Sequence, residues 1–152
     1  MKILALDLGT LMGFAMTTES GSIMSGTMSY KFDARYEGGG MRYIRFTKWL
    51  KEMEEFDFDL VTFEEVRRHA GTSAAHVYGG FLAVLTEWCE QNKTPYCGYP
   101  VGTIKKFATG KGNAGKEAMI EAARSWGFEP VDDNEADALA ILSLAMVENE
   151  GI

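Results

Sequence analysis

The chain has 152 residues, 46% of them apolar and 24% charged, which is typical of a globular protein long enough to bury a core. Its 15 basic and 22 acidic residues give a net charge of −7, which excludes a uniformly basic surface for binding nucleic acid. No apolar run is long enough to span a membrane, and no signal-peptide pattern opens the sequence. We therefore expect a cytoplasmic protein without membrane contact.

The first part of the chain predicts three strands, at residues 2–8, 11–19 and 21–32. Turn-forming residues separate the last two strands and favour an antiparallel hairpin. A glycine-rich loop follows at residues 33–40. Apolar residues then recur at helical spacing as far as Phe56, and this spacing predicts a buried side made of Met41, Ile44, Trp49 and Met53.

The rest of the chain alternates strands with helices. Two further strands are predicted at residues 59–66 and 94–101. Four further helices are predicted, one ending near Gln91 and the others at residues 101–110, 114–127 and 133–149. This order predicts an α/β fold in which a five-stranded mixed sheet is flanked by helices, as one domain over residues 1–152.

Neither the cysteines nor the histidines form a recognisable metal-binding pattern. Cys89 and Cys97 are too few for a disulfide framework and lack ligand spacing, so we expect buried free thiols. His69 and His76 are expected in a loop or on a helix surface.

Acidic residues interrupt three apolar elements. Asp7 ends the first strand, Glu64 and Glu65 end the fourth, and Asp137 lies in the first turns of the apolar last helix. If the first and fourth strands are parallel neighbours, their carboxyl ends meet at one edge of the sheet. Adjacent strand residues point to opposite faces, so only one glutamate can join Asp7, and spacing does not say which.

Asp133 and Asn134 fall on the same side of the last helix as Asp137. Buried carboxylates without a basic partner are costly, and a divalent cation would relieve that cost. Oxygen ligands without a histidine or cysteine cluster indicate Mg²⁺ or Mn²⁺ rather than zinc. Two structural alternatives stay open: Asp7 could shape the turn before Gly9, and Asp137 could be an exposed acid near a helix start.

Four segments resemble the RuvC family of Holliday junction resolvases, in particular its short bacteriophage-type members. They are "ILALDLGTLMGFA", "LVTFEEV", "GTIKKFATGKGNAGK" and "DDNEADALAI". The resemblance implies a ribonuclease H-like fold, a homodimer, and paired nicks in four-way and other branched DNA that leave 5′-phosphate and 3′-hydroxyl ends. It also implies two Mg²⁺ ions per site, for which Mn²⁺ can substitute. If the source is a virus, the expected location is the host-cell cytoplasm.

The resemblance also assigns roles to individual residues. Asp7, Glu64 and Asp137 match the catalytic metal-binding acids, with Glu65 as second choice to Glu64, and Asn134 occupies the position of a further ligand. Lys105 and Lys116 match two lysines near the DNA, and Lys116 is expected to neutralise charge on the phosphate during catalysis. Further contacts to DNA are expected from Lys106 and Lys111 on the same segment, and from Arg67 and Arg68 in the stretch that follows "LVTFEEV".

Three positions depart from the family pattern. Asn134 stands where an acid or histidine is usual, so Asp133 is an alternative ligand. Leu11 replaces a residue that is often basic, and Arg67 replaces an aromatic residue that some members insert into the junction. These departures leave open a junction-binding protein with weakened catalysis. A YqgF-type nuclease of pre-ribosomal RNA is a further alternative, whereas an actin-like ATPase needs two lobes that this chain is too short to form.

Overall fold

The computed structural model describes residues 1–150 and contains a five-stranded sheet of strand order β3-β2-β1-β4-β5. The strands β1, β2 and β3 pair antiparallel, and β4 and β5 add to β1 in parallel, so the predicted mixed sheet is confirmed. Their bounds are β1 Ile3–Asp7, β2 Leu11–Thr17, β3 Ile23–Ser29, β4 Leu60–Glu65 and β5 Tyr96–Pro100.

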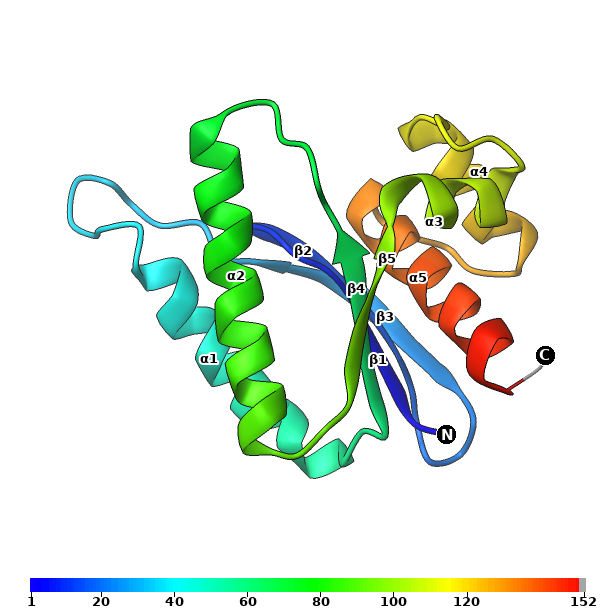
Figure 1. The fold of residues 1–152 in the computed structure, drawn as a ribbon, viewed down its shortest axis with the longest axis horizontal. Helices are drawn as coiled ribbons and strands as arrows, with labels where there is room; N and C mark the ends of the chain where they lie inside the picture. Colours follow the sequence, from blue (N-terminus) through cyan, green and yellow to red (C-terminus); the bar gives the residue numbers. More distant parts are fainter. Residues whose placement is uncertain (151–152) are drawn as a thin grey trace.

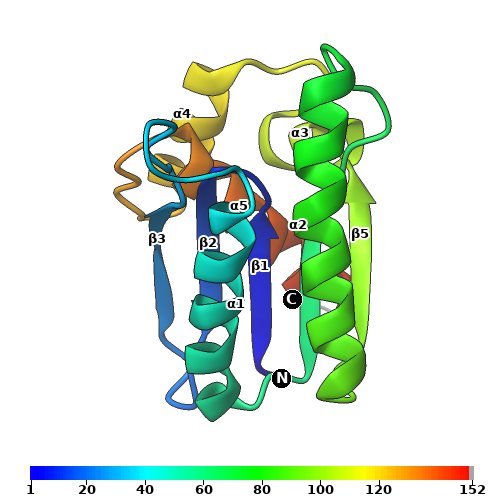
Figure 2. The same cartoon turned by 90° about the vertical axis from the view of Figure 1, so that its left-hand side faces the viewer.

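Helices cover both faces of the sheet. One face packs against α1 (Met41–Met53) and α2 (Thr72–Gln91), and the other packs against α5 (Asp133–Glu150), as Figures 1 and 2 show. A short 3-10 helix (Glu54–Phe56) follows α1. Two smaller helices, α3 (Val101–Thr109) and α4 (Lys116–Ser125), pack beside α5.

The helix α5 is buried on nearly every side, as its apolar sequence predicts. Its buried residues are mostly alanine and leucine, and small side chains let the helix lie close to β1 and β2. Asp137, near the start of α5, is therefore half-buried close to the carboxyl ends of the strands.

The predicted side of α1 is correct for Trp49, which is buried, and for Met53, which packs against the core, but it is wrong for Ile44. Ile44 is 61% exposed, whereas Phe46, Trp49 and Leu50 are buried against the sheet and α2. These three residues and Met53 follow one another at helical spacing, and Ile44 lies on the opposite side of the helix. Ile44 is apolar but does not belong to the core, so its hydrophobicity alone misplaces the buried side of the helix.

The two cysteines are free thiols, as predicted, although Cys97 is only half-buried. In the part of the chain that the structure describes, no helix has the length and hydropathy to cross a membrane.

Candidate active site at the ends of β1 and β4

The carboxyl ends of β1 and β4 lie side by side. The strands are parallel and pair Leu6 with Phe63, so Asp7 and Glu64 are the next residues along each strand. Leu60 of β4 packs in the core beneath α5, and alternation along the strand sends Glu64 to that same face. Asp7 follows Ile3 and Ala5 on the α5 face in the same way.

Glu65 points to the other face and has a different partner. Its carboxylate lies 3.1 Å from the Nε of Arg67. The structure thus separates the two adjacent glutamates: Glu64 joins Asp7, and Glu65 joins an arginine of the following loop.

The start of α5 is fixed by two acids whose carboxylates accept hydrogen bonds from the backbone and from β3. Asp132 accepts hydrogen bonds from the backbone N–H of Glu135 and the hydroxyl of Thr27, both at 2.8 Å. The buried Glu135 accepts hydrogen bonds from Ser25 at 2.7 Å and from the N–H of Val131 at 3.0 Å. These contacts cap the helix and attach it to β3, which orients the other polar residues of the segment.

Gly13 lets α5 approach the sheet beside Asp7. It pairs with Asp7 across β1 and β2, and a Cβ atom at this position would lie 1.8 Å from the backbone oxygen of Asn134. Only a glycine leaves room for this contact between strand and helix. We did not single out Gly13 from the sequence, although a glycine inside an apolar strand is a signal of close backbone approach.

The carboxyl groups of this site repel one another. Burial raises the pKa of Asp7 well above its usual range, and the charges of Asp137, Glu64 and Asp133 raise it further. Burial first, and then Glu64 and Asp133, raise the pKa of Asp137 to about 7. Burial also raises the pKa of Glu64, although its hydrogen bond with Asp7 and the charge of Lys105 act in the opposite direction.

The donor chemistry of this cluster fits a hard divalent cation. The cluster consists of the carboxylates of Asp7 on β1, Glu64 on β4 and Asp137 on α5. The amide of Asn134 and the carboxylate of Asp133 belong to the same end of α5. Among residues 1–150, no three His, Cys, Asp or Glu side chains stand close enough together to form a ready-made metal site, so these acids would have to draw closer around a cation. A bound cation would offset the repulsion that raises these pKa values.

The lysines differ in how close they come to the acids. Lys105, half-buried on α3, lowers the pKa of both Glu64 and Asp137, so its charge reaches the cluster. Lys116 at the start of α4 has its Nζ 3.9 Å from Asp133, with a side chain that is 80% exposed. Lys106, Lys111 and Arg68 are exposed near this edge of the sheet, and none has an ion pair among the described residues.

Tyr78 of α2 holds the end of β4 in place. Its hydroxyl donates a hydrogen bond to the carbonyl of Glu64 at 2.7 Å and accepts one from the N–H of Val66 at 3.3 Å. The ring also lies against His69, with ring centroids 5.2 Å apart. His69 therefore packs against Tyr78, and His76 is exposed on α2, as expected of residues outside the site.

We expect Tyr78→Phe to lower the free energy of unfolding by about 1–2 kcal/mol, because both backbone groups lose a partner. It should also slow any reaction that depends on the position of Glu64. Tyr96→Phe is the matched control, since that hydroxyl bonds only to the exposed Glu90. Chemical denaturation of both variants checks the result, and equal losses from the two would contradict the bridging role.

The carboxyl cluster also predicts a pH dependence when divalent cations are removed. Asp137 keeps its proton to about pH 7 in the folded chain, but loses it near pH 4 when unfolded. The folded state then binds more protons, so the free energy of unfolding should fall as the pH rises from about 4 to 7. Denaturation in EDTA across this range measures the slope, and Asp137→Asn should flatten it. A stability that rises over the same range would contradict the shift.

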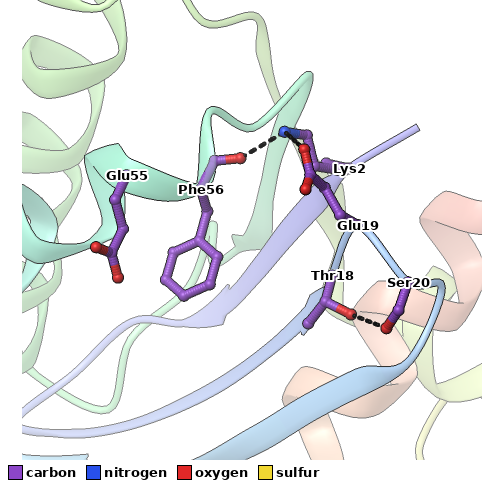
Figure 3. Close-up of a pocket in the computed structure, with 6 residues that line it drawn as sticks. All are labelled: Lys2, Thr18, Glu19, Ser20, Glu55 and Phe56. Carbon is purple, nitrogen blue, oxygen red and sulfur yellow. Dashed lines mark hydrogen bonds and ion pairs between the residues drawn. The ribbon is translucent and has the colours of Figure 1, made fainter.

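A separate cavity of about 370 Å³ lies at the opposite end of the sheet (Figure 3). Lys2 at its edge donates a hydrogen bond to the carbonyl of Phe56 at 2.7 Å and lies 3.9 Å from Glu19. Lys2 thus binds the end of the 3-10 helix. None of the carboxylates of the candidate active site lines this cavity.

No protein-family model matches the sequence, and no curated protein sequence matches it either. Solved structures are similar. Thermus thermophilus RuvC is 24% identical over 99% of this chain and 97% of its own, with a TM-score of 0.73. The same protein in complex with a Holliday junction substrate is 24% identical over 99% of this chain and 96% of its own, with a TM-score of 0.78.

A more distant structure shows the same arrangement. The yeast mitochondrial Holliday junction resolvase Ydc2 is 10% identical over 93% of this chain and 75% of its own, with a TM-score of 0.61. At these identities the similarity concerns the course of the backbone. The chain has the ribonuclease H-like fold of RuvC, with Asp7, Glu64 and Asp137 brought to one edge of its sheet.

Proposed function

We propose that the chain is a RuvC-family resolvase, a metal-dependent endonuclease that cuts four-way and other branched DNA. The observation that carries this proposal is the convergence of Asp7, Glu64 and Asp137 within the fold of RuvC. The solved RuvC structure includes a complex with a Holliday junction substrate, which supports the same class of substrate for this chain.

The three acids would hold Mg²⁺, for which Mn²⁺ can substitute. Asp7 would be one of these ligands, and the charges of both Asp137 and Glu64 act on its pKa. Asn134 supplies an uncharged oxygen donor, and Asp133 adds the negative charge that Asn134 lacks. Divalent ions at such a site lower the pKa of an attacking water and stabilise the leaving 3′ oxygen.

The basic residues would hold the DNA against the acids. The charge of Lys105 acts on both Glu64 and Asp137, which supports a contact between this lysine and the phosphate that is cut. Lys116 would neutralise charge on that phosphate after leaving Asp133, from which it is 3.9 Å distant. Lys106, Lys111, Arg67 and Arg68 would bind neighbouring phosphates, and a homodimer would present two such sites for paired cuts.

Cleavage of an end-labelled four-way junction tests this function. With Mg²⁺ or Mn²⁺ we expect symmetric paired nicks that can be religated directly, because the ends are 5′-phosphate and 3′-hydroxyl. A linear duplex of the same sequence should stay intact. Tight junction binding without cutting in either metal would instead indicate that Asn134 has weakened catalysis, and cutting of structured RNA alone would indicate the YqgF-type activity.

A further inference from the structure

A second group of basic residues lies across the sheet from the candidate active site. The segment from Lys31 to Lys51 holds six basic and two acidic residues, in a chain whose net charge is −7. It comprises the loop after β3 and most of α1, on the face opposite α5, as Figure 1 shows. The lysines near Asp133 and Glu64 belong to α3 and α4, on the other face.

The loop is tied to the edge of the sheet that carries Asp7. The N–H of Tyr30 donates a hydrogen bond to the carbonyl of Thr10 at 2.7 Å, and Thr10 follows Asp7 by three residues. Arg45 of α1 donates a hydrogen bond to the carbonyl of Lys31 at 2.8 Å. The beginning of the loop is thus fixed beside the end of β1.

The acids of the segment are already paired. Glu37 forms an ion pair with Arg45, and Asp33 lies 3.4 Å from the Nε of Arg35. Lys31 and Arg42 take part in no ion pair among residues 1–150. The segment therefore presents two cations, Lys31 in the loop and Arg42 in the first turn of α1, that form no ion pair with an acid among residues 1–150.

Arg42 is held in one orientation. Its guanidinium carbon lies 4.7 Å from the centre of the Phe32 ring, and its Nε is buried without a hydrogen-bond partner in the described chain. A guanidinium stacked on an aromatic ring loses little freedom when it binds an anion.

We infer that Lys31 and Arg42 bind the phosphate backbone of a second DNA arm, on the opposite side of the sheet from the arm held by α3 and α4. This inference rests on the proposed function. Four duplex arms diverge from a junction, and contact by one protomer with an arm other than the one it cuts would favour a junction over a linear duplex. A phosphate fits both the flat guanidinium and the exposed lysine.

The salt dependence of binding tests this inference. Each lost phosphate contact should reduce the slope of log affinity against log salt by about one. We expect Lys31→Gln and Arg42→Gln each to weaken junction binding severalfold in low salt, and the double variant to reduce the slope by about two. Lys93→Asn is the control: it removes one charge at the far end of α2, where a φ of 54° suits asparagine.

Arg42→Lys refines the test, because it keeps the charge but loses the flat stacked group. Affinity between those of the wild type and Arg42→Gln supports the inferred geometry. Should Arg42→Gln fail to fold, Lys31→Gln alone decides, since Lys31 is exposed. A folded double variant with an unchanged slope would overturn the second-arm contact while leaving the proposed function intact. A wild type that binds no junction in any salt would overturn both.

Discussion

Replacing Asp7 with asparagine is expected to abolish cleavage of a four-way junction and, at the same time, to stabilise the chain in the absence of divalent cations. Burial and the charges of the neighbouring carboxylates together raise the pKa of Asp7 well above its usual range. Asparagine keeps the shape but removes the charge that a cation requires. Cleavage should fall by roughly 10²–10³-fold or more, the scale for losing one key electrostatic group.

The gain in stability follows from the same repulsion. Removing one of several buried like charges should raise the free energy of unfolding at neutral pH in EDTA, because burial and the neighbouring carboxylates destabilise the charged form of Asp7. Asp57→Asn is a matched control at the opposite end of the sheet, where a φ of 52° accommodates asparagine. Single-turnover cleavage and thermal unfolding measure the two effects. A variant that still cuts, or one that is destabilised in EDTA, would contradict a site built for a cation.

Gly13→Ala is expected to have the largest effect on stability. The added Cβ would lie 1.8 Å from the backbone oxygen of Asn134, so no rotation of a side chain can relieve the clash. The start of α5 must move away from β2, and overpacking of this kind costs about 1–3 kcal/mol or more. Because the same turn of α5 carries Asp137, cleavage should be lost even where the variant stays folded.

Gly79→Ala is a control that should change the free energy of unfolding in the opposite direction. It lies within α2 with no atom within 4 Å of the added Cβ, and alanine favours a helix by up to about 1 kcal/mol over glycine. Denaturation of both variants should therefore show one clear loss and one small gain. If Gly13→Ala retained wild-type stability, the close packing of β2 against α5 would be wrong.

The sequence predicts the candidate site best where an acidic residue interrupts an otherwise apolar strand or helix. Asp7 in an apolar strand and Asp137 in an apolar helix predict a buried polar site, and the structure brings both to one edge of the sheet. The choice between Glu64 and Glu65 depends on strand register relative to α5, which spacing cannot supply. In the structure, the packing of Leu60 decides it.

Contacts between distant parts of the chain account for what was missed. Ser25 and Glu135 are 110 residues apart, and Thr27 and Asp132 are 105 apart, so no local pattern indicates that these acids anchor α5. The roles of Tyr78 and Arg42 likewise depend on neighbours from other segments. The misplaced side of α1 has a simpler cause, because one exposed isoleucine was counted as part of the core.

The most direct test of the candidate active site compares Glu64→Gln with Glu65→Gln in single-turnover cleavage of a four-way junction with Mg²⁺. The two residues are adjacent and undergo the same change of charge and shape, but only Glu64 faces Asp7 and Asp137. We predict a loss of roughly 10²-fold or more for Glu64→Gln and a change of no more than severalfold for Glu65→Gln. Equal losses, or a larger loss for Glu65→Gln, would contradict the assignment of the site to the α5 face of the sheet.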